Sequence, residues 1–514
     1  MVEPGLSLPD LFQQRAQQFA KYPAILFAGQ TLHYDALDEQ SSRVATGLHA
    51  LGVRQGQRVA LYCPNSDTFV LAYLGILKAG GTLVPINLLL NPKEIAYIMH
   101  DAEVTFLIYH AVFEASVNAC LADLTLPVQT VGIGETSAHT DWAALLSSPV
   151  CLPALTWQVQ DDIAVIIYTS GTTGHPKGAM LTHHNLISNT RSVNVAMRLE
   201  AGKDVLLVVL PMFHAFAATV GLLTPLLHGL SLVPMAKFDP ALVAQTIATH
   251  HVSIFLGVPS MYNVLLRLPD AATAQFAGLR FCVSGGAAMP VDLMQRFEQR
   301  FGVNIYEGDG PSECSPVTSI NPIGGVRKAG SIGLPIPDVD MKILDEAGDP
   351  VPLGDIGEIC VRGPNVMKGY LNQPEETAKA FFGDWFRTGD LGSEDSDGYF
   401  YIVDRKKDMI IVNGMNVYPR VLEEVLYQYP DLIEVAVVGE PSERHGEIVV
   451  AHVVLKAGVE TSSKAIRHFC KAHVGSHEVP KKVVFLSELP KNAAGKIVKR
   501  ALRKHGELAR GVVS

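Results

Sequence analysis

The feature that most constrains the fold is a regular alternation of short apolar runs and longer amphipathic stretches over the first 404 residues. The apolar runs have the length of buried strands, and stretches such as Ser66–Lys78 and Pro290–Phe301 have the spacing of helices. Strands that alternate with helices form parallel sheets covered by helices. The runs behind this prediction are Arg58–Tyr62, Val104–Tyr109, Ile163–Tyr168, Val205–Leu210, Ser253–Leu256 and Leu279–Val283.

From about Gly333 the pattern changes to short strands and turns, which is typical of an antiparallel or barrel-like unit. The dense charge run Asp404–Asp408 separates that unit from a final pattern of two helices and two strands. We therefore predict an α/β protein with two domains. Residues 1–404 form a large N-terminal domain with parallel αβα sheets and a small β-barrel-like subdomain, and residues 405–514 form a smaller, mobile α/β C-terminal domain.

Composition agrees with a globular enzyme of more than one domain. The chain has 514 residues, of which 48% are hydrophobic and 18% are charged. Its seven cysteines form no Cys-x-x-Cys pair, and its first residues lack the basic and apolar regions of a secretory signal. These features favour a cytoplasmic protein with reduced thiols.

One segment, Ala215–Met235, has no charged residue and is long enough to cross a membrane. Gly221, Pro225, Gly229 and Pro234 interrupt it, which predicts a buried helix, a turn and a short strand. We expect no transmembrane segment, while a peripheral contact with a membrane surface stays open.

Charge is distributed unevenly along the chain. Residues 405–514 carry a net charge of +6 and the first 404 residues a net charge of −16, within a total of −10. Such an imbalance suits an anionic ligand held between two domains. The sequence has no basic stripe with interleaved aromatic residues, so we expect no binding of nucleic acid.

A glycine-rich and hydroxyl-rich loop, Tyr168–Gly178, follows the strand-like run that begins at Ile163. Backbone N–H groups in such a loop can surround phosphate oxygens, and Lys177 adds a positive charge. The loop lacks the Gly-Lys-Ser/Thr of a Walker A sequence and the Gly-x-Gly-x-x-Gly of a dinucleotide turn. The phosphate-binding candidates are Thr169, Ser170, Gly171, Thr172, Thr173, Gly174 and Lys177.

The loop resembles the signature loop of the acyl-adenylate-forming superfamily, and four further blocks follow it in the order found in that superfamily. They are Tyr306–Cys314, Trp385–Leu391, Asp404–Pro419 and Pro490–Ile497. The chain looks most like the bacterial medium-chain and long-chain fatty-acid–CoA ligases. The resemblance implies that a carboxylate and ATP form acyl-AMP and pyrophosphate, and that the thiol of coenzyme A then displaces AMP.

The second block is similar to the superfamily's Gly-aromatic-Gly-x-Thr-Glu segment, with Ser312 and Glu313 at the hydroxyl and acid positions. By this resemblance Glu313 and Thr169 hold Mg²⁺ against the triphosphate, since Mg²⁺ prefers oxygen ligands. Asp309 replaces an aromatic residue that packs on adenine, so an adenine contact by Asp309 stays open. The resemblance also places nucleotide contacts at Gly285, Gly286, Ala287, Glu307, Gly308, Asp309 and Ser312.

The remaining blocks supply the other roles that the resemblance implies. Asp390 and Arg405 contact the ribose, Lys407 is the hinge of the C-terminal domain, and the Gly414 loop lines the pantetheine tunnel. Lys496 matches the catalytic lysine, which offsets the repulsion between a carboxylate and the α-phosphate of ATP. His214 matches a histidine beside the acyl carboxylate.

The segments expected to line the acyl pocket contain no charged residue: Met212–Leu223, Phe255–Val264 and Cys282–Ala288. A buried ammonium or second carboxylate would need a charged partner, so an apolar monocarboxylic acid fits best. We predict a fatty acid of unresolved chain length. An aryl acid of the cinnamate or benzoate type is the nearest alternative.

Two other classes remain open at this stage. A fatty acyl-AMP ligase would pass the acyl group to a carrier protein, and such enzymes carry an insertion that the short Asp390–Asp404 connection lacks. A relative that only binds ligands is disfavoured by the intact charged residues of the five blocks. The sequence leaves open whether the protein is a monomer or a homodimer.

Overall fold

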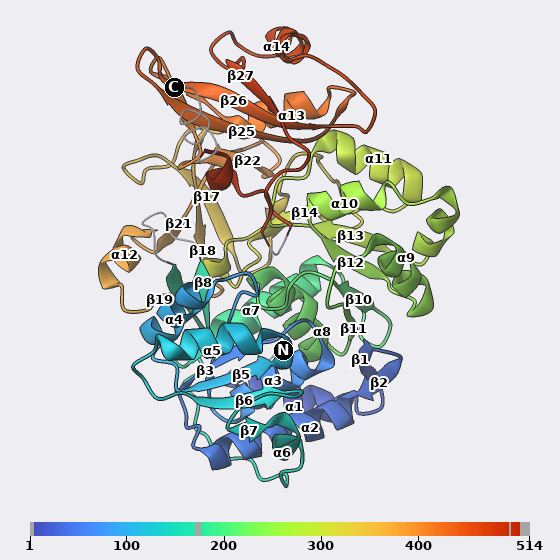
Figure 1. The fold of residues 1–514 in the computed structure, drawn as a ribbon, viewed down its shortest axis with the longest axis vertical. Coiled ribbons are helices and arrows are strands. Elements are labelled where there is room, and N and C mark those ends of the chain that lie inside the picture. The colour runs from blue at the N-terminus through green and yellow to red at the C-terminus, as the bar shows by residue number, and fades with distance from the viewer. Residues whose placement is uncertain (1–4, 170–175, 493–494, 504–514) are drawn as a thin grey trace.

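The computed structural model describes residues 5–169, 176–492 and 495–503 of the chain. Four sheets and the helices around them make up this part of the molecule (Figure 1). The α/β architecture expected from the alternating pattern is confirmed. Within the described ranges, no helix is both long enough and apolar enough to cross a membrane.

The first sheet has eight strands, and its central strands are parallel. On one side of this sheet β8 pairs antiparallel with β9, which pairs with the edge strand β19, and the glycine-rich loop connects β8 to β9 in the sequence. In spatial order the strands are β19 (Gly369–Tyr370), β9 (Lys177–Thr182), β8 (Ile163–Thr169), β4 (Thr82–Pro85), β3 (Arg58–Tyr62), β5 (Phe106–His110), β6 (Gln129–Ile133) and β7 (Thr140–Asp141).

The second sheet has nine strands and is parallel from β1 to β14. In spatial order the strands are β16 (Leu334–Pro335), β15 (Ser319–Ile320), β14 (Ile305–Asp309), β13 (Phe281–Ser284), β12 (Ile254–Gly257), β10 (Val205–Val208), β11 (Ser231–Pro234), β1 (Pro23–Phe27) and β2 (Gln30–His33). The carboxyl ends of β13 and β14 therefore lie side by side, where ligands bind in open parallel sheets.

Helices connect the strands, and their ends follow local rules. The helix expected over Ser66–Lys78 is α3, and the Ser66 hydroxyl caps it by accepting the N–H of Phe69. The helices of residues 5–404 are α1 (Leu8–Gln18), α2 (Tyr34–Leu51), α3 (Asp67–Lys78), α4 (Pro92–Asp101), α5 (Glu114–Ala122), α6 (Trp142–Leu146), α7 (His183–Ala196), α8 (Thr224–His228), α9 (Pro240–Thr249), α10 (Pro259–Leu265), α11 (Val291–Phe301) and α12 (Pro374–Lys379), with short turns at Ala111–Phe113, Asp270–Phe276 and Ser312–Cys314.

The uncharged segment Ala215–Met235 is buried, as the interrupting residues predicted. It forms a π-helical turn over Ala217–Leu223, then α8, and then strand β11 after Gly229. Gly229 has a φ of 74°, the left-handed conformation that ends a helix at low cost.

An antiparallel sheet follows the two parallel sheets, in agreement with the change of pattern near Gly333. It contains β17 (Asp340–Leu344), β18 (Gly357–Arg362), β21 (Trp385–Glu394), β20 (Phe381–Phe382) and β22 (Phe400–Arg405). Strands β21 and β22 are joined by the short turn of residues 395–399.

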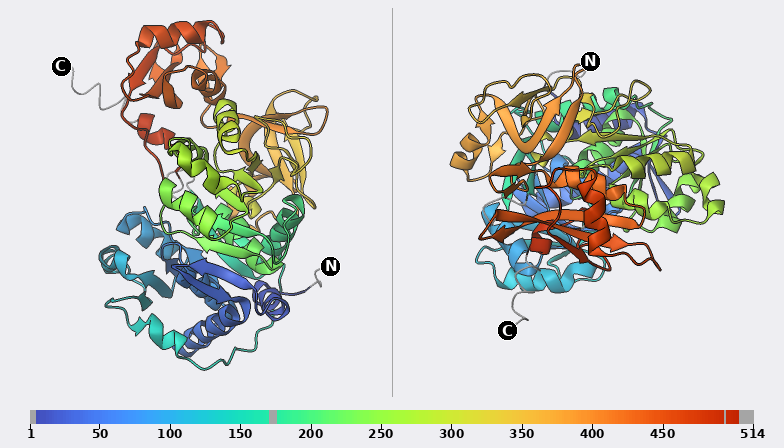
Figure 2. Two further views of the ribbon diagram at one scale, coloured as in Figure 1. Left: turned by 90° about the vertical axis from the view of Figure 1, so that its right-hand side faces the viewer. Right: turned by 90° about the horizontal axis from the view of Figure 1, so that it is seen from above.

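The described residues after Arg405 form a fourth sheet and the helices beside it, and Figure 2 shows them at one end of the molecule. The elements are β23 (Ile410–Val412), β24 (Met415–Val417), α13 (Pro419–Tyr427), β25 (Leu432–Ser442), β26 (Gly446–Leu455), α14 (Ser463–Lys471) and β27 (Lys482–Phe485). Two clusters of core residues lie within residues 8–400 and two within residues 410–502; among the described residues no cluster combines the two parts.

Candidate active site

The glycine-rich loop joins the ends of β8 and β9, where Thr169 and Lys177 are register partners. This arrangement places both of these predicted phosphate-binding residues side by side at the same end of the sheet. Ser170, Gly171, Thr172, Thr173 and Gly174, the other candidates of the loop, lie outside the described residues.

Glu313 lies opposite Thr169, although 144 residues separate them in the sequence. The Thr169 hydroxyl donates to Glu313 Oε1 at 3.1 Å, and the Tyr370 hydroxyl donates to the same oxygen at 3.0 Å. Burial and the Glu313 charge raise the pKa of Tyr370, so its hydroxyl remains a donor. One carboxylate beside one hydroxyl is a set of hard oxygens that fits Mg²⁺, which takes most of its other ligands from water and substrate phosphates.

Lys177 is paired with a carboxylate that the sequence analysis did not identify. Its Nζ lies 2.5 Å from Glu376 Oε2 and 5.1 Å from the centre of the Tyr370 ring. The hydrogen bond from Lys177, followed by that from Lys379, lowers the pKa of Glu376 to about 2. Lys177 is thus held in place by Glu376, with which a bound phosphate would compete.

Asp390 and Arg405 form the next part of the site. They are register partners on β21 and β22, and Arg405 Nε donates to Asp390 Oδ1 at 3.2 Å. The Asp390 charge raises the pKa of Arg405. The structure therefore brings together the two residues expected to contact ribose.

Lys496 reaches the same cluster from the C-terminal part of the chain. Burial, followed by the charge of Arg405, lowers the pKa of Lys496 to about 8, while Asp390 and Asp309 act in the opposite direction. Lys407 also acts on Lys496 electrostatically, and burial lowers the pKa of Lys407 itself. An ammonium at position 496 thus lies within the electrostatic reach of both ribose-site residues.

His214 lies within the electrostatic reach of Lys496. The surrounding protein, followed by the Lys496 charge, lowers the pKa of His214 to about 4, even though part of the ring is open to solvent. Both causes favour the neutral ring, and its Nδ1 accepts the N–H of Phe216 at 3.4 Å. His214 can therefore lie beside a carboxylate as a neutral hydrogen-bonding group.

Asp309 and Glu307 both lie on strand β14, but their surroundings differ. Burial, followed by the Asp390 charge, raises the pKa of Asp309 to about 6, and Arg405 and Lys496 lower it. Glu307 is only 2% exposed, and its Oε1 accepts the N–H of Met289 at 3.0 Å. Asp309 thus belongs to the charged cluster around Lys496, whereas Glu307 is enclosed behind it.

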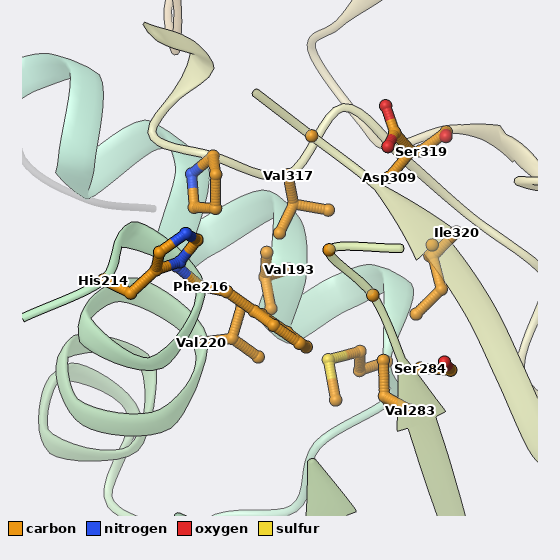
Figure 3. A pocket seen from close by; sticks show the side chains of 16 residues that line it. Val193, His214, Phe216, Val220, Val283, Ser284, Asp309, Val317, Ser319 and Ile320 are labelled. Atoms are coloured by element: carbon orange, nitrogen blue, oxygen red, sulfur yellow. The ribbon is translucent and has the colours of Figure 1, made fainter. Parts of the chain in front are cut away.

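A pocket opens beside His214, and Figure 3 shows the apolar side chains of Val193, Val220, Val283 and Val317 around it. Asp309 is the charged residue in its lining. The full lining is Val193, Met197, His214, Phe216, Val220, Val283, Ser284, Gly285, Gly286, Gly308, Asp309, Gly310, Pro316, Val317, Ser319 and Ile320.

The pocket differs from the sequence prediction in one wall. Residues near His214 and Val283 line it as expected, but the segment Phe255–Val264 does not. Phe255 is buried within the core, while Val258 and Ser260 face Gly495. Helix α7 and the segment Pro316–Ile320 supply the missing wall, and nothing in their local sequence indicated this.

The other predicted residues lie around these groups. Ser312 precedes Glu313 in a short turn, and Gly285 and Gly286 follow β13 at the pocket. Gly414 stands at the turn between β23 and β24 with a φ of 79°, which glycine adopts without strain. Ala287 directly follows the two pocket glycines.

Comparison with known proteins gives consistent matches along the chain. The family model "AMP-binding enzyme" matches residues 12–371, and the model "AMP-binding enzyme C-terminal domain" matches residues 421–496. A long-chain-fatty-acid–CoA ligase of Bacillus subtilis is 35% identical over 97% of this chain and 94% of its own length.

Two further proteins extend the comparison. A feruloyl-CoA synthase from Amycolatopsis is 37% identical and aligns with 96% of this chain and 97% of its own. The crystal structure of ATP-bound MatB from Rhodopseudomonas palustris superimposes with a TM-score of 0.90 at 33% identity, covering 97% of this chain and 99% of that one.

Proposed function

We infer that this chain, which belongs to the AMP-binding enzyme family and is an adenylate-forming acid–thiol ligase that uses ATP and CoA, activates fatty acids. The observation that carries this proposal is the pocket beside His214 and Lys496, whose side walls are uncharged. A carboxylate that entered it would lie between the neutral His214 and the ammonium of Lys496. The rest of the acid would be surrounded by apolar side chains.

The charged cluster suits the first half-reaction. One carboxylate oxygen of the acid attacks the α-phosphorus of ATP, the bond to the β-phosphate oxygen breaks, and pyrophosphate leaves. Lys496 reduces the repulsion between the two anions and stabilises the charge that builds up on the α-phosphate. Asp390 and Arg405 orient the ribose, and Thr169 and Lys177 hold the leaving phosphates.

Glu313 and Thr169 would hold Mg²⁺. When bound, Mg²⁺ would neutralise charge on the phosphates. Tyr370 donates to Glu313 and fixes the direction of its carboxylate. This role would need few protein ligands besides Glu313 and Thr169, because Mg²⁺ takes most of its ligands from water and substrate phosphates.

We propose that residues 405–514 turn about Lys407 between the two half-reactions, which brings the Gly414 loop to the site for the attack of the CoA thiol on the acyl carbonyl. The separate core clusters on the two sides of Arg405 support this division. Lys407→Pro is then expected to slow mainly thioester formation, because proline restricts the backbone at the hinge. Unchanged turnover would remove the hinge proposal.

An aryl acid remains the second candidate, because the feruloyl-CoA synthase is as similar to this chain as the fatty-acid ligase is. Transfer to a carrier protein is less well supported, because β21 and β22 are joined by a short turn with no insertion.

The test is a panel of acids incubated with purified protein, Mg-ATP and CoA. Saturated fatty acids of increasing length, ferulate, benzoate and a dicarboxylic acid are compared by pyrophosphate release and by acyl-CoA formation. We expect both products with fatty acids. Release with aryl acids alone would favour the second candidate, and AMP release that required a carrier protein would exclude CoA as the acceptor.

A further inference from the structure

Arg420, at the start of α13, connects the C-terminal part of the chain to the parallel sheet. Its guanidinium Nη2 lies 3.7 Å from Glu307 Oε1 on β14, and the two side chains are 13% and 2% exposed. Its backbone N–H donates to Asp404 Oδ2 at 2.8 Å. Arg420 is thus held on two sides by carboxylates that precede the proposed hinge at Lys407.

Glu307 depends on this contact for charge compensation. Its Oε1 accepts one backbone N–H, from Met289, while its Oε2 is buried without a hydrogen-bond partner among the described residues. Burial raises the pKa of Glu307 to about 7, and the charge of Arg420, 3.7 Å away, acts in the opposite direction and favours the ionised form. A carboxylate enclosed in this way is costly to leave without a compensating charge.

Two further contacts, close to Lys496, join helix α10 to the C-terminal part of the chain. Ser260 Oγ donates to the backbone oxygen of Gly495 at 3.0 Å, and Asn263 Nδ2 donates to that of Ile433 at 3.0 Å. Gly495 is packed closely here, since a Cβ at that position would lie 2.9 Å from Ser260 Oγ. In Figure 1, α13 lies near α11 and above β14.

We propose that Arg420 is a positioning residue. Its ion pair with Glu307 stabilises the arrangement of the two domains in which Lys496 lies in the site. The ion pair breaks before the thioester step. This inference rests on the proposed function, because it requires two half-reactions. Arg420 is thirteen residues beyond Lys407, on the part that turns, and Glu307 is on the part that does not. The two groups therefore separate whenever Lys496 leaves.

The test compares Arg420→Ala with Lys482→Ala. Lys482 also pairs with a nearly buried glutamate, Glu440, at 2.5 Å, but both members of that pair lie in the C-terminal part. Acyl-AMP formation is measured by exchange of pyrophosphate into ATP, and the second step by thioester formation from supplied acyl-AMP.

We expect Arg420→Ala to slow acyl-AMP formation about tenfold while thioester formation is unchanged or faster, since about 1.4 kcal/mol corresponds to tenfold in an equilibrium constant. Arg420→Lys should recover most of the loss. Lys482→Ala should leave the ratio of the two rates unchanged. Adding Glu307→Gln to Arg420→Ala should cost less than the sum of the two single changes.

The proposal would be overturned if Arg420→Ala slowed acyl-AMP formation and thioester formation equally. It would also be overturned if Lys482→Ala changed the ratio of these two rates as much as Arg420→Ala does. Hydrogen exchange without substrate separates its failure from that of the proposed function. Arg420→Ala should speed exchange of the backbone amides of residues 257–265, which contact Gly495 and Ile433 through Ser260 and Asn263. Lys482→Ala should not change their exchange. Unchanged exchange would contradict the inference even if no acid were a substrate.

Discussion

The two ends of the active site differ in composition and in where their residues come from. At the nucleotide end, Glu313, Asp390, Arg405 and Lys496 are charged and belong to separate elements. At the acyl end, the pocket has uncharged walls formed by α7, the π-helical turn, β13 and the segment Pro316–Ile320. Under the proposed function, the difference implies that the chemistry and the choice of acid depend largely on separate sets of side chains and can be altered independently.

The largest expected effect is at the nucleotide end. Lys496→Ala should slow acyl-AMP formation by about 10²–10³, the range observed when one group that stabilises a transition-state charge is removed. Thioester formation from supplied acyl-AMP should be largely retained. Pyrophosphate exchange and acyl-CoA formation measure the two steps, and equal loss of both would contradict the role of Lys496.

Glu313→Gln should lower kcat/KM for Mg-ATP about a hundredfold, because it removes the charge expected to hold Mg²⁺. Tyr370→Phe is the matched control, since it removes one hydrogen bond to the same carboxylate and should cost only a few-fold. A Glu313→Gln enzyme with an unchanged dependence on Mg²⁺ concentration would remove the metal assignment.

At the acyl end, Val193→Phe should lower kcat/KM for the longest substrates about tenfold and leave the KM for ATP unchanged, because the larger ring fills part of the pocket. Val195→Phe on the same helix is the control, since Val195 is 57% exposed and Val193 is 1% exposed. A uniform loss across chain lengths would indicate damage to folding and not a change of selectivity.

The smallest effect concerns pH. Burial lowers the pKa of Lys496 to about 8, and the role proposed for Lys496 requires its ammonium form. Adenylation should therefore be fully active below that value and decline as the pH rises through it, about tenfold for each unit above. The pH profile of kcat/KM reports this group in the free enzyme. Lys496→Arg should remove the alkaline decline, and a decline that persisted would belong to another group.

The sequence predicted much of the fold because apolar periodicity is local. Strand Ile163–Thr169 and helix α3 were placed within a residue or two, since each has its own pattern and flanking turn residues. The glycine-rich loop Tyr168–Gly178 and the four later sequence blocks could be recognised from the sequence, because such combinations of residue types are uncommon.

Contacts between distant residues could not be predicted in this way. Glu376 pairs with Lys177 across 199 residues, and Tyr370 bonds to Glu313 across 57. Neither Glu376 nor Tyr370 carries a local signal, because an exposed acidic helix and a short strand are common. The absence of Phe255–Val264 from the pocket lining could not be predicted for the same reason, since the burial of Phe255 in the core depends on the packing of the whole sheet.

The most direct measurement is a competition without CoA. Purified protein is mixed with Mg-ATP and equal amounts of a fatty acid, ferulate, benzoate and a dicarboxylic acid, and the enzyme-bound adenylate is identified by mass spectrometry. The pocket, whose lining is uncharged apart from Asp309, predicts that the fatty acyl adenylate predominates and that added CoA converts it to acyl-CoA. An adenylate of the dicarboxylic acid, or of ferulate or benzoate in excess of the fatty acyl adenylate, would contradict the assignment.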